Sequence, residues 1–262
     1  MYQLGIDTGG TFTDFVVYDE EAVRLQSFKH SSTPDDPARS VISGIERAFY
    51  EYNFAPSDIS RIVYGTTVAT NALLESKGSN TGLITTDGFR DILEIRRQWR
   101  PKLFDLYYVK PKSLVPRHHR IEMGERLNAN GEVLQSIELE VLRKEIKRLV
   151  NDGVEAIAVS FLFSFLNPVH EKLVKALIQK EFPHIYVTIS SEICPEFREY
   201  ERTATTVLNA YLMPITSSYL KRLRGRIKEK NIQVPLRIMQ SNGGLMKSQD
   251  LESAPVNSLL SG

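Results

Sequence analysis

The sequence predicts an α/β fold in which a mixed sheet is flanked by helices. Short apolar runs, typical of buried strands, alternate along the chain with longer segments of helical periodicity. Glycine and proline mark many of the joints between these segments. With 262 residues, the chain is long enough for one large domain or two smaller ones, each with a hydrophobic core.

In the first part of the chain, the pattern predicts a three-stranded start followed by strands and helices in alternation. The expected positions are strands at 3–7, 12–18 and 23–29, a helix at 37–52, a strand at 61–64, a helix at 68–76 and a strand at 82–85. The first two strands flank a Thr/Gly turn and should form a hairpin. Gly78 is placed to end the helix that precedes it.

The second part contains the longer helices. The expected positions are a hairpin at 124–134, a helix carrying the apolar stripe at 141–150, a strand at 156–163, a helix at 167–182, a strand at 185–189, a helix at roughly 197–230 and a strand at 236–239. Pro214 lies inside the longest helix, so we expect a kink or a break there. We expect one domain at 1–194 and the beginning of a second at 195–262.

The composition argues against several classes of partner and of cellular location. The chain has 33 Lys and Arg against 32 Asp and Glu, so its charge favours neither nucleic acid nor an anionic membrane as a partner. Its one cysteine, Cys194, cannot form a disulfide within the chain and suits a reducing compartment. The N-terminus has no pattern of a secretory signal. We therefore expect a cytoplasmic protein.

The most informative motif lies at the first turn and reads Gly5-Ile6-Asp7-Thr8-Gly9-Gly10-Thr11-Phe12-Thr13-Asp14. Glycines at a turn let backbone N–H groups converge on an anion, and the three threonines add hydroxyl donors. Asp7 ends the first strand and is a hard oxygen ligand suited to Mg²⁺ or its waters. The motif therefore indicates a site for a Mg²⁺-bound polyphosphate.

Two other interpretations fit this motif less well. A plain hairpin turn needs only one or two special residues, fewer than this segment contains. An aspartic protease could use Asp7-Thr8-Gly9, but it needs a pair of such aspartates. A second copy of the motif is absent from the sequence, although a homodimer could supply one. The alternation of strands and helices argues against that all-β class.

Read alone, the hairpin resembles the first phosphate loop of the actin, hexokinase and heat-shock chaperone ATPases. Further blocks make the resemblance narrower: Gly65-Thr66-Thr67-Val68-Ala69-Thr70-Asn71-Ala72, Gly88-Phe89-Arg90-Asp91, Arg97-Gln98, Pro195-Glu196-Phe197-Arg198-Glu199-Tyr200-Glu201-Arg202 and Met239-Gln240-Ser241-Asn242-Gly243-Gly244. In this order they resemble the hydantoinase A / 5-oxoprolinase family, which also includes acetophenone carboxylase subunits. The chain departs from it at Arg96, where the family usually has glycine, which puts a tight turn there in doubt.

The resemblance implies a ribonuclease H-like (actin-like ATPase) lobe and the start of a second lobe. It also implies ATP and Mg²⁺ as cofactors, used to phosphorylate the carbonyl oxygen of a cyclic amide such as hydantoin or 5-oxoproline. Asp7 would position Mg²⁺ through water, and Asp7 and Thr11 would be catalytic. The residues expected to hold the β- and γ-phosphates are Thr8, Gly9, Gly10, Thr11 and Thr13, with Asp14 bracing the turn or reaching the metal shell.

Other residues at strand ends are candidates for substrate contact: Thr66, Thr67, Asn71, Arg97, Ser241, Asn242 and Gly243. Each group also has a simpler explanation. The two threonines could cap a helix, the segment after 239 could be a turn, and the basic run around Arg97 could be a solvated loop.

Family members continue well past residue 262, with a second phosphate loop and an adenosine-binding segment. We therefore expect this chain to be the front part of such an enzyme and to bind nucleotide weakly by itself. Alternatives are an ATP-dependent ketone carboxylase subunit, a small-molecule kinase of the same superfamily and a non-enzymatic actin-like nucleotide-binding protein. The family also implies a hydantoinase B-type subunit as a possible partner and an oligomer at full length.

Overall fold

A computed structural model describes residues 1–33, 35–99 and 104–259. It divides into two compact units, the first formed by Met1–Lys77 with Ile215–Gly262 and the second by Gly78–Pro214. The units are therefore cut differently from the predicted domains, whose boundary at residue 195 falls inside the second unit. The predicted boundary stays a prediction about the family's domains.

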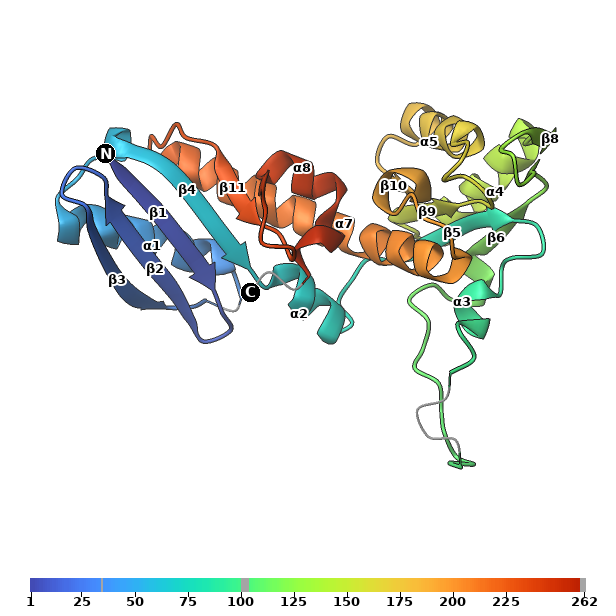
Figure 1. Cartoon of the computed structure of the whole chain (residues 1–262), viewed down its shortest axis with the longest axis horizontal. Coiled ribbons are helices and arrows are strands. Elements are labelled where there is room, and N and C mark those ends of the chain that lie inside the picture. The colour runs from blue at the N-terminus through green and yellow to red at the C-terminus, as the bar shows by residue number, and fades with distance from the viewer. Residues whose placement is uncertain (34, 100–103, 260–262) are drawn as a thin grey trace. The chain divides into compact units, whose positions relative to one another are not determined.

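The first unit contains a six-stranded mixed sheet with the order β12-β11-β4-β1-β2-β3 (Figure 1). Its strands are β1 (Tyr2–Thr8), β2 (Phe12–Asp19), β3 (Arg24–Ser31), β4 (Ile59–Thr66), β11 (Leu236–Met239) and β12 (Leu245–Lys247). β1, β4 and β11 run parallel, while β2, β3 and β12 pair antiparallel with their neighbours. The predicted N-terminal hairpin and third strand are confirmed.

Helices cover one face of this sheet. The helical segments of the first unit are α1 (Pro37–Tyr52), α2 (Val68–Leu74), α8 (Ser248–Ser253), the 3₁₀ turns Pro56–Asp58 and Pro255–Ser258, and the later part of α7 (Glu199–Glu229). Buried side chains alternate along β1 at Leu4 and Ile6 and pack with residues of α1 and α7 in one core. Gly44 of α1 permits close packing, because a Cβ there would lie 2.1 Å from the Phe15 ring.

The second unit contains a four-stranded sheet with the order β10-β9-β5-β6, in which all neighbours are parallel. Its elements are β5 (Thr81–Thr86), α3 (Ile92–Ile95), the 3₁₀ turn Arg117–His119, β6 (Arg120–Met123), the hairpin of β7 (Arg126–Leu127) and β8 (Val133–Gln135), α4 (Leu139–Asn151), β9 (Ala156–Ser160), α5 (Val169–Glu181), β10 (Tyr186–Ile189), α6 (Ser190–Ile193) and the first part of α7. Such a buried parallel sheet explains the continuous apolar runs in the sequence.

Two expectations for this unit were wrong in detail. The strand predicted at 156–163 ends at Ser160, because the next two backbone N–H groups leave the ladder. The N–H of Phe161 donates to Glu171 Oε1 at 3.0 Å, and that of Leu162 donates to Thr86 Oγ1 at 3.0 Å. Of the kink or break predicted at Pro214, the break does not occur, since α7 continues through that residue.

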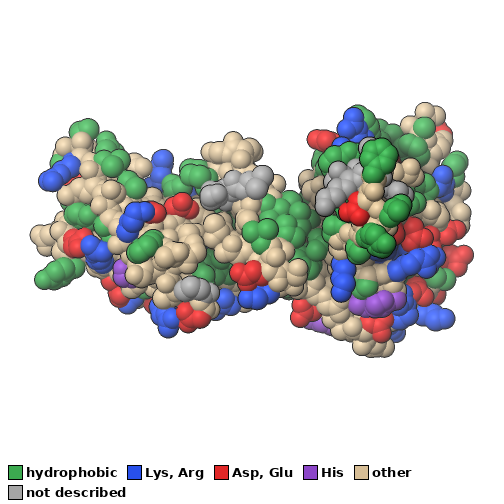
Figure 2. All heavy atoms as spheres, turned by 90° about the horizontal axis from the view of Figure 1, so that it is seen from below, with side chains coloured by type: hydrophobic (Ala, Val, Ile, Leu, Met, Phe, Trp, Pro, Cys, Tyr) green, Lys and Arg blue, Asp and Glu red, His purple; other side chains and the backbone are tan. Residues whose placement is uncertain are grey.

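Charged side chains of both signs are interspersed over the face drawn in Figure 2, as the near-zero net charge leads one to expect. Within the described ranges, none of the helices combines the length and apolar character needed to cross a bilayer.

Candidate functional site

The N-terminal hairpin has a fixed register that decides where its side chains point. Asp7 lies opposite Asp14, and Thr8 lies opposite Thr13. The turn closes through the Gly9 N–H, which donates to the Phe12 carbonyl at 3.0 Å. Ser32, directly after β3, holds the turn in place, because its N–H donates to the Thr11 carbonyl at 2.9 Å and its hydroxyl to the Gly9 carbonyl at 2.9 Å.

The predicted phosphate- and metal-binding side chains lie on opposite faces of this hairpin, because successive residues of a strand point to opposite sides. Thr8 lines a cavity of about 550 Å³ together with Gly9 and Gly10. Asp7 and Asp14 line a separate cavity of about 260 Å³ on the other face. The motif therefore presents hydroxyl and glycine groups on one side and carboxylates on the other.

Thr8 and Thr13 are both buried, but their hydroxyls differ in bonding. Thr13 Oγ1 lies 3.0 Å from Ser32 Oγ and 3.3 Å from Ser40 Oγ. Those two serines donate their own protons to carbonyls, Ser32 to Gly9 and Ser40 to Pro37. Thr13 must therefore donate inward, where it supports the turn instead of facing a ligand.

Thr8 Oγ1 is buried and has no hydrogen-bond partner among the described residues. The neighbouring Tyr64 hydroxyl pairs instead with the Tyr219 hydroxyl at 2.5 Å. Burial raises the pKa of Tyr64, and weaker polar contacts from the Thr66, Thr8 and Tyr219 hydroxyls lower it, although Thr8 Oγ1 does not reach hydrogen-bonding geometry with Tyr64 or any other described residue. A buried hydroxyl without a partner is costly, so Thr8 is prepared to donate to a ligand in the cavity.

The end of β4 joins the same cavity because β4 runs parallel to β1, with Thr66 beside Thr8. The Thr67 hydroxyl donates to the Thr8 carbonyl at 3.1 Å, and Asn71 Nδ2 donates to Thr67 Oγ1 at 3.4 Å. Thr67 and Asn71 line the cavity with the hairpin. Thr66 is buried, and its Oγ1 accepts from the Val68 N–H at 3.3 Å, whereas Thr67, at the N-cap of α2, makes no side-chain capping bond.

The carboxylate face has the chemistry of a cation site but not of a protein-only metal cage. Asp7 is exposed, and partial desolvation, followed by the charge of Asp14, raises its pKa. Asp14 forms an ion pair with Lys29 at 2.9 Å. Within the part of the chain that the structure describes, no group of three His, Cys, Asp or Glu side chains could enclose a metal. Mg²⁺ at Asp7 would thus take most of its ligands from water and phosphate oxygens.

The remaining sequence candidates lie elsewhere. Thr11 is exposed at the tip of the turn. The segment of Ser241, Asn242 and Gly243 forms the turn between β11 and β12, in which Gly243 has a φ of 82° and the Gly244 N–H donates to Asn242 Oδ1 at 2.9 Å. These three residues do not line the cavity beside the hairpin.

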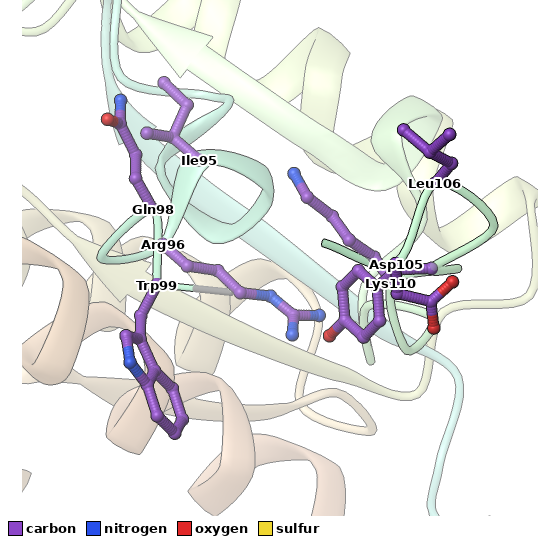
Figure 3. A pocket seen from close by; sticks show the side chains of 8 residues that line it. Ile95, Arg96, Gln98, Trp99, Asp105, Leu106 and Lys110 are labelled. Atoms are coloured by element: carbon purple, nitrogen blue, oxygen red, sulfur yellow. The ribbon is translucent and has the colours of Figure 1, made fainter. Parts of the chain in front are cut away.

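Arg97 belongs to the second unit and forms an ion pair with Glu201. The residue before it, Arg96, has a φ of 55°, a left-handed conformation that favours glycine. The tight turn that the family's glycine suggests is therefore present despite the arginine. Arg96 also lines a cavity of about 620 Å³, into which its side chain extends from the end of α3 (Figure 3).

Sequence reasoning missed the residues that complete the cavity beside the hairpin. Ser32 anchors the turn, and Lys77 and Arg222 line the cavity. No motif marked them, since Ser32 directly follows an ordinary strand and Arg222 belongs to a charged helical surface. Only the fold brings α7 next to the hairpin within the first unit.

Comparison with known proteins assigns the chain to one family. The model of the hydantoinase/oxoprolinase N-terminal region matches residues 3–182, and the hydantoinase/oxoprolinase model matches residues 202–262. The caprolactamase subunit alpha of Pseudomonas jessenii is 37% identical over 267 residues, covering 100% of this chain and 38% of that protein. The acetophenone carboxylase gamma subunit of Aromatoleum aromaticum is 30% identical over 276 residues, covering 99% and 37%.

The fold agrees with this grouping. The crystal structure of the ATP-dependent caprolactamase from Pseudomonas jessenii matches with a TM-score of 0.87 at 35% identity, covering 98% of this chain and 39% of that one. The resemblance found in the sequence and the predicted ribonuclease H-like α/β fold are confirmed. The chain spans less than two fifths of the length of these relatives.

Proposed function

Because the chain belongs to the hydantoinase/oxoprolinase family, we propose that it forms the N-terminal part of an ATP-dependent enzyme that opens cyclic amides of the hydantoin or 5-oxoproline type. The observation that carries the proposal is the hairpin of the first unit, where Thr8, Gly9 and Gly10 face one cavity with Thr67 and Asn71. The relative named an ATP-dependent caprolactamase supports both the nucleotide and the amide.

The chemistry gives a reason for using ATP. An amide carbonyl is a poor electrophile, and transfer of the γ-phosphoryl group to its oxygen makes the carbon open to attack by water. Phosphoryl transfer depends mainly on alignment and on neutralising charge. A rigid turn with inward-facing donors and a nearby carboxylate for Mg²⁺ is suited to both tasks.

Within this proposal, different hairpin residues bind phosphate, position the metal ion and support the turn. Thr8, with the backbone of Gly9 and Gly10, binds phosphate oxygens, and Thr67 and Asn71 complete that wall. Asp7 positions Mg²⁺, which when bound offsets phosphate charge. Thr13 and Ser32 hold the turn in shape. Thr11, exposed at the tip, is available to the reacting phosphoryl group. We further propose that the protein is cytoplasmic.

The test uses the full-length protein with Mg²⁺ and ATP. Phosphate release is measured with hydantoin, 5-oxoproline, caprolactam, and an aryl ketone with bicarbonate, and the products are identified. Ring opening coupled to phosphate release is the expected result. A stable phosphorylated product would replace the proposal with a kinase, and absence of any product with all substrates would favour a nucleotide-binding protein without catalysis.

A second candidate is a subunit of an ATP-dependent ketone carboxylase. The 30% identity to the acetophenone carboxylase gamma subunit favours it. The same assay separates the two, because a carboxylase would consume ATP only when ketone and bicarbonate are both present.

We also propose that the full-length protein binds a hydantoinase B-type subunit through residues that follow α3, namely Trp99 and 104–112. The relatives named above are themselves called subunits. Among the described residues of this segment, five large apolar side chains are 82% to 97% exposed: Trp99, Phe104, Leu106, Tyr107 and Val109. Lys110 and Lys112 add positive charge, so an apolar partner surface edged with carboxylates would complement it.

Binding of the two full-length subunits can be measured by surface plasmon resonance. Replacing Leu106 and Val109 by serine should weaken binding at least about tenfold. Leu134→Ser, which changes an exposed apolar residue elsewhere in the second unit, is the matched control. Unchanged binding in the double variant would rule out this segment as the contact.

A further inference from the structure

Two cationic side chains, Lys77 and Arg222, line the cavity that contains Thr8, Gly9 and Gly10. Neither belongs to the hairpin motif, and they lie 145 positions apart in the chain. Lys77 follows α2, and Arg222 lies on α7. All of these residues belong to the first unit, so the cavity is a feature of one compact body.

Arg222 differs from most of the other basic residues on the later part of α7. Lys221 and Arg224 pair with Glu252, Arg226 pairs with Asp36, and Lys230, just after the helix, pairs with Glu46. Lys228 has no ion pair among the described residues either, but it does not line the cavity. In residues 1–33, 35–99 and 104–259, no carboxylate lies within ion-pairing distance of Arg222. Its Nη1 donates to Ser218 Oγ at 2.6 Å, which orients the guanidinium and leaves its other N–H groups available.

The charge of the cavity wall favours an anion. Glu75 is its only carboxylate among the described lining residues, and Lys77 offsets it through an ion pair at 2.6 Å. The other lining cation, Arg222, therefore gives the cavity wall one positive charge that no described lining carboxylate offsets. Because an arginine carries five N–H donors in a planar fork, it suits the oxygens of a phosphoryl group or a carboxylate.

A second, independent observation points to the same ligand. Thr8 Oγ1 is buried at this cavity without a partner among the described residues. A Cβ at Gly10 would meet nothing within 4 Å, so the space beside the turn is open. A hydroxyl donor, an amide donor from Asn71 and a free guanidinium therefore surround the same space.

We propose that Arg222, assisted by Lys77, binds the terminal phosphoryl group of the nucleotide in this cavity. The proposal rests on the proposed ATP-dependent function and extends it, because it assigns the charge-neutralising side chains. Arg222 is preferred over Lys77 as the main contact, since Lys77 is already paired with Glu75. An anionic substrate carboxylate has similar oxygen chemistry, and the experiment must separate the two.

The experiment measures the affinity of the full-length protein for Mg²⁺-ATP, ADP and AMP by isothermal titration calorimetry. Arg222→Gln should weaken ATP binding at least about tenfold, while AMP binding stays within twofold, because a charged hydrogen bond to the terminal group is lost. Lys77→Gln should have a smaller effect in the same direction. Arg222→Lys, which keeps the charge, should recover part of the affinity.

The matched control is Lys228→Gln, a change to an exposed lysine on the same helix that does not line the cavity. Thermal unfolding of each variant shows whether it is folded. Unchanged ATP affinity in Arg222→Gln, with affinity lost in Thr8→Val, overturns this inference and leaves the proposed function standing. Failure of the unmodified protein to bind any nucleotide overturns the proposed function itself. A raised KM for an anionic substrate with unchanged ATP affinity assigns Arg222 to a carboxylate and also overturns the inference.

Discussion

Thr8→Val and Thr13→Val remove the same hydroxyl group from facing positions of one hairpin, and we expect them to have opposite effects. Each replaces a hydroxyl by a methyl of similar size, so packing changes little. Thr13 is bonded to Ser32 and Ser40, whereas Thr8 Oγ1 has no partner in the described residues. The pair therefore separates a structural hydroxyl from one kept for a ligand.

The magnitudes follow from this bonding. Thr13→Val loses a buried hydrogen bond and should lower the free energy of unfolding by about 1–2 kcal/mol. Thr8→Val removes a buried polar group that gains nothing in the free protein, so stability should stay the same or rise by up to about 1 kcal/mol. Nucleotide affinity should respond in the other order, with a fall of about tenfold or more for Thr8→Val and little change for Thr13→Val.

Urea unfolding gives the stabilities, and titration calorimetry with Mg²⁺-ATP on the full-length protein gives the affinities. The reasoning is refuted if Thr8→Val is clearly less stable than the unmodified protein, because its hydroxyl would then have a partner in the free state. It is equally refuted if Thr13→Val loses nucleotide affinity while keeping its stability.

Three further predictions concern the same unit. Asp7→Asn should abolish Mg²⁺-dependent nucleotide binding. It should also raise the free energy of unfolding slightly at neutral pH, because the raised pKa of Asp7 means that the ionised form is disfavoured in the folded chain. This gain should vanish in urea unfolding below pH 3, where the carboxyl is protonated in both the folded and the unfolded state. Gly44→Ala should cost about 1–3 kcal/mol in urea unfolding, because its Cβ would overlap an aromatic ring of β2 at 2.1 Å. Gly10→Ala should leave the melting temperature unchanged, since nothing lies within 4 Å of the new Cβ, but calorimetry should show weaker Mg²⁺-ATP binding.

Much of the first unit could be predicted because its signals are local. The hairpin follows from glycines and threonines between two apolar runs, and α1 follows from an apolar stripe of helical period. The end of β9 could not be predicted in this way. Its last apolar residues look like strand, but Phe161 bonds to Glu171 and Leu162 to Thr86, and these partners are 10 and 76 positions away.

The candidate site shows the same limit. The motif indicated which residue types would surround a polyphosphate, but not which of them are already hydrogen-bonded within the protein. Thr13 fits the pattern as well as Thr8 does, yet its proton is committed to a neighbouring serine hydroxyl. Arg222 fits no pattern; what sets it apart is that it lines the cavity and, among the described residues, lacks the carboxylate partner that Lys221, Arg224 and Arg226 have. Only the tertiary structure shows which polar groups already have hydrogen-bond or ion-pair partners.

The division of the motif between two faces is compatible with one Mg²⁺-nucleotide if the phosphate chain crosses the turn. Asp7 and Thr8 are successive residues, so their side chains diverge from adjacent points at the end of β1. Beyond them, Gly10 and Thr11 are exposed and give the chain of phosphates a path over the tip. Phosphate oxygens on the Thr8 side would meet hydroxyl, amide and guanidinium donors, and a metal ion on the Asp7 side would offset two carboxylates of which Lys29 neutralises only one. The hairpin would then separate anion-binding from cation-binding groups, and the small residues of its turn would let one ligand contact both.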